Sequence, residues 1–203
     1  MIAAAGLVSL DYLADCLRQM AAASNGKAHS DGWGYAFRRD TYWSTRKSVV
    51  SCLDDDVLKD SAKGFSELAV FHARKAKTGP DIRFTQPLGM KGYLIFHNTR
   101  FSNGEYDPNR LIEYLEERLK HDSFSDALSG LEDVHGANVI LVDINRILIG
   151  VKHNGSDYFR MHYSADSKGV VVSSEALPGR EWNVLPSGSV MELYPDGKMF
   201  LNE

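Results

Sequence analysis

The stretch LAVFHARKAKTG, residues 68–79, decides how the rest of the chain is interpreted. Its first half is a short apolar run with β-branched and aromatic members, which predicts a buried strand over residues 68–73. The strand leads into Arg74, Lys75 and Lys77. Because a guanidinium offers a fixed fork of donors, Arg74 at the end of a rigid strand is a candidate for binding a carboxylate. A solvated basic loop after an ordinary core strand is the structural alternative.

The beginning of the chain predicts a strand followed by an amphipathic helix. The opening run MIAAAG is small and apolar, as in a buried strand. Ser9 or Asp11 can cap a helix over residues 10–23, in which apolar side chains recur at helical spacing. Cys16 lies on that apolar stripe, so we expect a buried core thiol there and not a nucleophile.

Two glycines flank Trp33 in the motif HSDGWGYAF, residues 29–37. Glycine permits a positive φ or a close approach of the backbone to another group. The motif therefore fits a tight turn with a core tryptophan, or a backbone that passes close to a ligand or to the end of another strand. We expect a return strand of a hairpin over residues 41–50 and a short helix over residues 54–63 to follow.

The run KGYLIFHN, residues 91–98, predicts a second buried strand that ends at Asn98. Asparagine at a strand end can be an ordinary turn residue, or it can direct its side-chain amide at a developing oxyanion. After a loop, Asp107 followed by proline marks the start of a helix that runs to about residue 120. A second helix is expected over residues 123–134.

From residue 137 onward the pattern is typical of strands. The runs ANVILVD, RILIGVK, DYFRMHYS and GVVVSSEAL are separated by turn residues, and a strand, an Asp-Gly turn and a last strand complete the chain. This order predicts an α+β protein in which two mainly antiparallel sheets pack face to face with helices outside. A length of 203 residues fits one domain over residues 1–203.

Composition excludes several classes of function. The net charge is −4 and no basic stripe is interleaved with aromatics, which argues against a nucleic-acid partner. No apolar run is long enough to span a bilayer, so we expect a cytoplasmic protein with no membrane partner. His29, Asp31, His72 and His97 could be imagined as a metal site, but no histidine pair has helical spacing. Satisfied polar groups are the commoner explanation, and we expect no metal.

The motifs HSDGWGYAF, FHARKAKTG, FHNT and VVVSSEAL followed by Trp182 resemble, in order and spacing, the class II glutamine amidotransferase domain. The stand-alone, single-domain members are the most similar subgroup, and the resemblance covers nearly the whole chain. It implies the N-terminal nucleophile hydrolase fold, a four-layer αββα sandwich. It also implies a glutaminase that needs no cofactor: an N-terminal Cys attacks the side-chain amide of glutamine, with its own α-amino group as base.

The resemblance assigns roles to residues of this chain. Arg74 would bind the α-carboxylate of glutamine, and Asn98 would supply one oxyanion donor from its side chain. The backbone amide of Thr99 would supply the other donor. Trp33 and Gly34 would lie beside the nucleophile, in contact with the substrate.

Asp107 would hold the substrate ammonium, although its use as a helix N-cap is sufficient to explain it.

The sequence departs from the family at three places. It begins with Met1 and Ile2 where the family begins Met-Cys-Arg, so the nucleophile is not present. Thr99 replaces a glycine, which would be strained if that turn needs a positive φ. Gln86 stands where many members have histidine.

These departures leave several hypotheses open. Met1 corresponds to the family's fourth residue, and the first hypothesis is that the start was assigned to an internal Met of a working glutaminase. Alternatively, the chain is a degenerate member that binds glutamine or a related amide without cleaving it, or a hydrolase of a γ-glutamyl amide. If ammonia is produced for a synthesis, the acceptor enzyme is expected to be a separate synthase chain.

Overall fold

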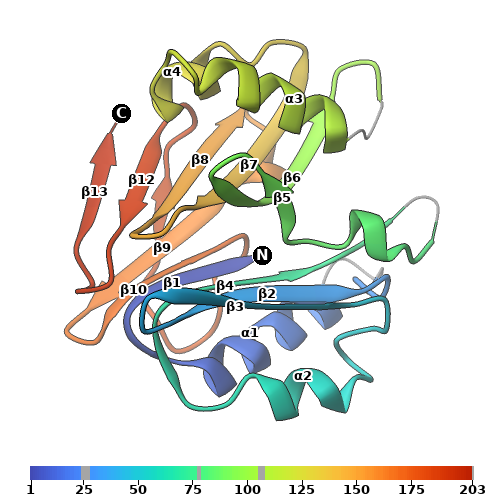
Figure 1. Ribbon diagram of the computed structural model, residues 1–203, viewed down its shortest axis with the longest axis vertical. Coiled ribbons are helices and arrows are strands. Elements are labelled where there is room, and N and C mark those ends of the chain that lie inside the picture. Colours follow the sequence, from blue (N-terminus) through green and yellow to red (C-terminus); the bar gives the residue numbers. More distant parts are fainter. Residues whose placement is uncertain (24–27, 77–78, 105–107, 203) are drawn as a thin grey trace.

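A computed structural model describes residues 1–23, 28–76, 79–104 and 108–202 (Figure 1). Within them, the strands form two sheets, and every pairing between strands is antiparallel. The first sheet has seven strands in the order β11-β9-β10-β1-β4-β2-β3. Their bounds are β1 (Ile2–Ser9), β2 (Trp33–Arg39), β3 (Tyr42–Ser48), β4 (Phe65–Ala73), β9 (Met161–Asp166), β10 (Gly169–Ser173) and β11 (Asn183–Leu185).

The second sheet has six strands in the order β13-β12-β8-β7-β6-β5. Their bounds are β5 (Leu88–Met90), β6 (Tyr93–Phe101), β7 (Val134–Val142), β8 (Ile147–His153), β12 (Val190–Leu193) and β13 (Met199–Asn202). The central strands β1 and β7 are buried along most of their length, because each sheet is covered on both faces.

Helices cover the outer face of each sheet (Figure 1). The helices are α1 (Leu10–Ala23), α2 (Asp56–Ser61), α3 (Pro108–Arg118) and α4 (Phe124–Ser129), with short 3₁₀ turns η1 (Ile82–Phe84) and η2 (Asp157–Phe159). The α1 helix begins where expected, because Ser9 Oγ accepts a hydrogen bond from the backbone N–H of Tyr12 at 3.2 Å. Helices α1 and α2 pack on the first sheet, and α3 and α4 pack on the second.

Three apolar layers separate these elements, as the alternation of β1 illustrates. Ile2 and Ala4 pack toward α1, whereas Met1, Ala3 and Ala5 face the second sheet. A third layer joins the second sheet to α3 and α4. The arrangement is the four-layer αββα sandwich that the element order predicts.

Three predicted boundaries are wrong. Strand β6 does not end at Asn98 but continues to Phe101, because its pairing with β7 continues past that point. The helix expected over residues 123–134 ends at Ser129, where Gly130 caps it, and Val134 already belongs to β7. The sequence DYF at the start of the run DYFRMHYS forms the 3₁₀ turn η2 and not a strand.

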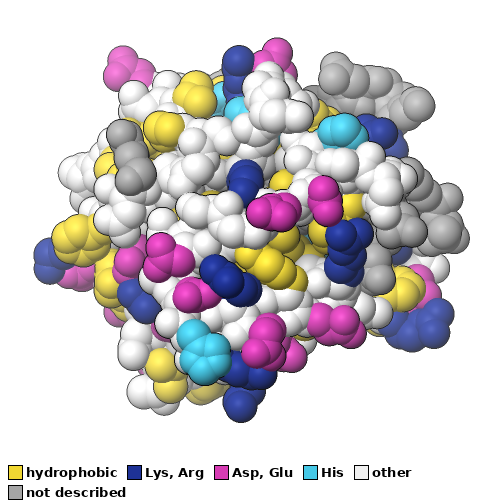
Figure 2. All heavy atoms as spheres, turned by 90° about the horizontal axis from the view of Figure 1, so that it is seen from above, with side chains coloured by type: hydrophobic (Ala, Val, Ile, Leu, Met, Phe, Trp, Pro, Cys, Tyr) yellow, Lys and Arg dark blue, Asp and Glu magenta, His cyan; other side chains and the backbone are white. Residues whose placement is uncertain are grey.

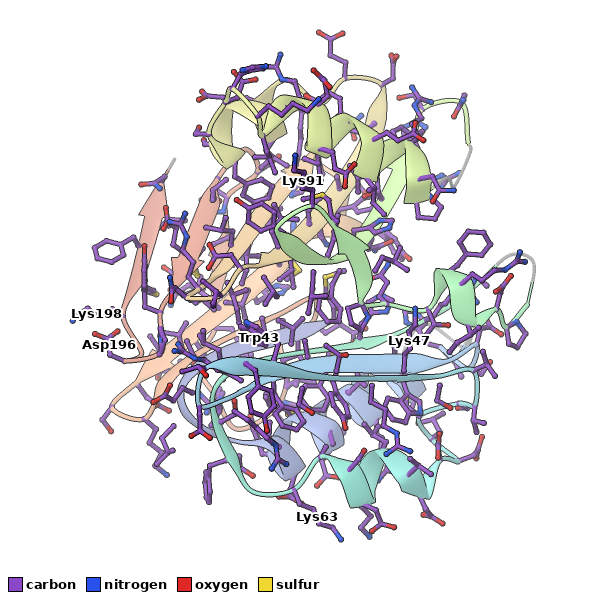
Figure 3. All side chains as sticks on the ribbon, viewed as in Figure 1. Trp43, Lys47, Lys63, Lys91, Asp196 and Lys198 are labelled. Atoms are coloured by element: carbon purple, nitrogen blue, oxygen red, sulfur yellow. The ribbon has the colours of Figure 1, made fainter. Side chains whose placement is uncertain are left out.

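Contacts other than side-chain packing also join the two sheets. Trp43 of β3 lies between them and donates from Nε1 to the carbonyl oxygen of Asp143, beyond β7, at 2.9 Å (Figure 3). At the end of β1 remote from Met1, Gly6 (φ 94°) pairs with Gly169 (φ 139°). A Cβ on Gly197, in the turn between β12 and β13, would lie 3.5 Å from the Cα atoms of both. At this end the backbones of the two sheets therefore leave room between them for a Cβ atom and little more.

The surface seen from above, over α3 and α4, carries acidic and basic side chains interspersed (Figure 2). This face has no field of a single sign that would attract a polyanion. Within the described ranges, no helix combines the length and the apolar character that crossing a bilayer requires.

Candidate active site

A pocket of about 60 Å³ lies between the sheets, where the start of β1, the end of β4 and the middle of β6 come together. This volume is well below the roughly 300–1,000 Å³ typical of small-molecule sites. The lining residues are Met1, His29, His72, Ala73, Arg74, Lys75, His97, Asn98, Tyr158 and Ser174. None of these ten described residues carries a carboxylate side chain, so the pocket suits an anionic or hydrogen-bond-accepting group.

Arg74 is the pocket's buried cation, with 3% of its surface exposed. Its backbone is fixed by the preceding loop: Arg74 N–H donates to the Gly32 carbonyl at 2.8 Å, and Asp31 N–H donates to the Arg74 carbonyl at 3.1 Å. The guanidinium donates from Nη1 to the Gly79 carbonyl at 3.0 Å, whereas its Nε has no partner. No carboxylate among the described residues pairs with this guanidinium. Since a buried charge without a counter-charge is costly, an anion bound beside Arg74 would lower that cost.

Asn98 lies on the face of β6 that meets the first sheet. On this strand Leu94 and Phe96 pack between the sheets, whereas Ile95 and Phe101 pack toward the helices. Because side chains of a strand alternate between its two faces, Asn98 lies on the same face as Leu94 and Phe96. Its side chain therefore lies on the inner face and reaches the pocket. The structure therefore brings Asn98 and Arg74 to the same pocket from different sheets.

The backbone amide of Thr99 is directed away from β7. His97 turns both its N–H and its C=O toward the side chain of Gln86, on the β5 side of the strand. Because successive residues of an antiparallel strand alternate in this direction, Asn98 turns to β7 and Thr99 turns to the β5 side again. Among the described non-glycine residues, only Asp40 and Asp133 have a positive φ, so threonine at position 99 is not strained.

The α-amino group of Met1 is buried in the pocket and donates a hydrogen bond to Ser174 Oγ at 3.0 Å. Burial disfavours the charged form and lowers the pKa of this amine to about 6. The amine is therefore mostly neutral at pH 7, although Glu175 opposes the shift.

Histidines in the pocket are also kept neutral by burial. Desolvation lowers the pKa of His97 to about 4 and holds the pKa of His72 well below its usual range. Desolvation likewise lowers the pKa of His29. In the part of the chain that the structure describes, no three His, Cys, Asp or Glu side chains are grouped so as to hold a metal ion.

Trp33 does not place its side chain in the pocket. Its indole lies in the core between the first sheet and its helices, and Nε1 donates to Asp55 Oδ2 at 2.9 Å. The backbone of this turn contacts the site instead, since the Gly32 carbonyl accepts from the Arg74 N–H. Gly34, in contrast, passes close to another element, because a Cβ there would lie 1.8 Å from the carbonyl oxygen of Gln86. The glycine permits a close approach of the backbone, here to a loop residue that precedes β5.

The remaining predicted residues lie elsewhere. Cys16 and Cys52 are both buried in the core between the first sheet and its helices, and burial raises the pKa of Cys52 to about 11. Neither thiol is a lining residue of the pocket. Asp107 lies outside the described residues.

Three residues of this region escape prediction from motifs alone. Gln86 and Asn138 are fully buried, and Ser174 contacts the Met1 amine. A polar residue inside the apolar run of β7 is the only sequence signal for Asn138. Gln86 and Ser174 lie in stretches that are compared with the family above, but no sequence pattern predicts which residues they contact.

The sequence matches no protein-family model and no curated protein. Solved structures do resemble it. A glutamine phosphoribosylpyrophosphate amidotransferase from B. subtilis matches with a TM-score of 0.71 and 14% identity, over 99% of this chain and 48% of that one. The present chain thus spans about half the length of that relative.

Two further structures match over nearly their whole length. A glutamine aminotransferase class-II domain protein from Silicibacter pomeroyi has a TM-score of 0.66 and 15% identity, over 100% of this chain and 97% of that one. A predicted glutamine amidotransferase from Pseudomonas aeruginosa has a TM-score of 0.58 and 15% identity, over 98% and 94%. The chain has the fold of the class II glutamine amidotransferase domains, the N-terminal nucleophile hydrolase sandwich.

Proposed function

We propose that this protein hydrolyses the side-chain amide of glutamine to glutamate and ammonia, as an N-terminal nucleophile hydrolase. The observation that carries the proposal is the buried Arg74 guanidinium, which has an unpaired Nε and no carboxylate partner among the described residues. The α-carboxylate of glutamine would supply the missing counter-charge in a bidentate geometry. Asn98 lies in the same pocket, on the opposite sheet, as a donor for the amide end.

The register between β1 and β4 supports a position for this nucleophile. Ile2 pairs with Phe71 and Ala3 with Val70, so each step back along β1 is a step forward along β4. A residue two positions before Met1 would come opposite Arg74. Its side chain would also face the second sheet, because alternate residues of β1 lie on the same face and Met1 and Ala3 face that sheet. A Cys in that place corresponds to the family's nucleophile.

The chemistry would use this Cys, which the printed sequence does not contain. Its α-amine takes the thiol proton while the sulfur attacks the amide carbon of glutamine. The oxyanion is stabilised by the side chain of Asn98 and the N–H of Thr99. The C–N bond then breaks, the amine returns the proton to the leaving ammonia, and water cleaves the thioester to release glutamate. Asp107 is proposed to bind the substrate ammonium.

The test compares two forms of the protein. In one, Cys and Arg precede Met1; in the other, Ser replaces that Cys. The Cys form is expected to release glutamate and ammonia from L-glutamine in equal amounts, and the Ser form is expected to bind L-glutamine without turnover. No turnover by a folded Cys form that still binds L-glutamine would reject the hydrolase and favour a binding protein. The intact mass of the protein from its native source decides whether Cys and Arg precede Met1.

The physiological amide is a separate question within the same proposal. A γ-glutamyl amide presents the same α-carboxylate and the same scissile carbonyl as glutamine, so Arg74 and Asn98 would serve both. Comparing L-glutamine with a γ-glutamyl alkylamide in the Cys form separates the two substrates. If glutamine is preferred, a separate synthase chain is the proposed acceptor of ammonia, and we place the reaction in a single cytoplasmic domain.

A further inference from the structure

Gln86 is a fully buried residue whose side chain completes the edge of the second sheet. Its Nε2 donates to the His97 carbonyl at 2.8 Å, and its Oε1 accepts from the His97 N–H at 2.7 Å. A carboxamide offers one acceptor and a donor, as a peptide group does. The side chain therefore satisfies both backbone groups of His97 at once.

The position of these bonds continues the ladder between β5 and β6. Leu88 pairs with Ile95 and Gly89 with Leu94, so the next hydrogen-bonded position places residue 86 opposite His97. The side chain of Gln86 takes the place that a backbone pair would have there. It keeps β6 ordered at the residue that directly precedes Asn98 and Thr99.

The backbone of Gln86 is turned to the first sheet instead. Its carbonyl oxygen lies so close to Gly34 of β2 that a Cβ at position 34 would come within 1.8 Å of it. Gly34 pairs with His72, two residues before Arg74 on the adjacent strand. One residue thus contacts β6 through its side chain and β2 through its main chain, beside the pocket.

We infer that Gln86 is a positioning residue that sets the separation between Arg74, on the first sheet, and the donors of Asn98 and Thr99, on the second. The inference rests on the proposed function, in which glutamine spans these two sheets. A ligand that reaches from Arg74 to Asn98 depends on that separation. A ligand that contacts Arg74 alone does not.

Two ligands of different length test the inference on the chain as it stands. L-glutamine carries both the α-carboxylate and the side-chain amide, whereas glycine carries only the groups expected at the Arg74 end. NMR titrations would compare the wild type with Gln86→Leu, and with Gln19→Leu as the matched control on the exposed face of α1. We expect Gln86→Leu to weaken L-glutamine binding at least tenfold and to leave glycine binding unchanged, whereas Gln19→Leu changes neither.

Gln86→Glu gives an independent check. A protonated carboxyl group has a donor and an acceptor, so it can replace the amide, whereas a carboxylate has no donor for the His97 carbonyl. L-glutamine binding by Gln86→Glu, relative to the wild type at the same pH, should recover as the pH falls from 8 to 5.

The outcomes separate the inference from the proposed function. Equal loss of L-glutamine and glycine binding in Gln86→Leu would assign Gln86 a general structural role and overturn the inference. So would unchanged binding of both ligands. If neither the folded wild type nor the folded Ser form binds L-glutamine, the proposed function fails, and the inference that rests on it fails with it.

Discussion

Asn98 of β6 and Asn138 of β7 lie directly opposite each other, on the face of the second sheet that meets the first. Side chains so paired have Cβ atoms about 4.5–5.5 Å apart. Asn98 reaches the pocket, but Asn138 is completely buried, and neither its Oδ1 nor its Nδ2 has a hydrogen-bond partner among the described residues. The second sheet thus buries an unsatisfied amide directly beside the proposed oxyanion donor.

Replacing Asn138 by an apolar residue of similar size should stabilise the protein. A buried amide that loses its hydrogen bonds to water costs about 1–3 kcal/mol, and Asn138→Leu removes that cost. We expect a higher midpoint of urea unfolding with an unchanged slope. The control Asn183→Leu, at an exposed position of β11, should have little effect. A lower midpoint for Asn138→Leu would mean that the amide has a partner in solution, such as a bound water.

The close approach of β2 to Gln86 makes Gly34 sensitive to substitution. An added methyl group would lie 1.8 Å from the Gln86 carbonyl and 3.0 Å from the Arg46 carbonyl, and both neighbours are backbone. Gly34→Ala should therefore cost more than about 3 kcal/mol, at the high end for a point mutation. Gly89→Ala, in β5, meets nothing within 4 Å and should be neutral or slightly stabilising. Similar unfolding midpoints for the two variants would contradict the contact.

We expect Arg74 to contribute more to the affinity for a ligand than to the stability of the fold. Arg74→Met keeps most of the apolar stem and removes a buried charge that has no counter-ion, so stability should be unchanged or higher. L-glutamine binding should weaken by about 30- to 1,000-fold, the equivalent of roughly 2–4 kcal/mol. The matched variant Arg83→Met removes an exposed arginine and should leave binding intact. Calorimetric titration checks both, and unchanged affinity in Arg74→Met would remove this residue from the site.

The buried histidines should make the protein sensitive to acid. Burial lowers the pKa of His97 to about 4, below the value near 6.5 of an unfolded chain, so the unfolded state binds protons first. The stabilising effect is complete above pH ~6.5 and is lost as the pH falls toward 4, by roughly 3 kcal/mol for this group. His72 shifts in the same direction.

Urea unfolding at intervals between pH 7 and pH 4 measures this dependence. His97→Leu should have a shallower fall in stability over this range than the wild type, because one buried histidine no longer accepts a proton. An equally steep fall in the variant would assign the acid sensitivity to other groups.

Regular local patterns made much of the fold predictable. The apolar spacing over residues 10–23 and the cap at Ser9 give α1 its bounds, because helix periodicity and capping are local properties. The end of β6 is different. Asn98 and Thr99 read as turn residues, but pairing with β7 extends the strand to Phe101, and that partner is distant in sequence.

The candidate site, too, has features that the sequence predicts and features that it does not. Arg74 could be predicted because it directly follows a strongly apolar strand, and it does line the pocket. The side chain of Trp33 could not be placed, because the face it occupies depends on the register of β2 and on Asp55, twenty-two residues away. The bonds from Gln86 to His97 also join residues that no motif links.

The contact of Gly6, Gly169 and Gly197 has a consequence for redesign of this protein. A Cβ at Gly197 would already touch the Cα atoms of Gly6 and Gly169, so a side chain larger than a methyl group there would press the two sheets apart, and an insertion in this turn would displace the β12–β13 pair. The spacing between the two sheets is therefore constrained at that end of the molecule. Libraries that vary the opposite end, around the first residues of β1 and the last of β4, can alter which molecules are accepted while the frame keeps its dimensions.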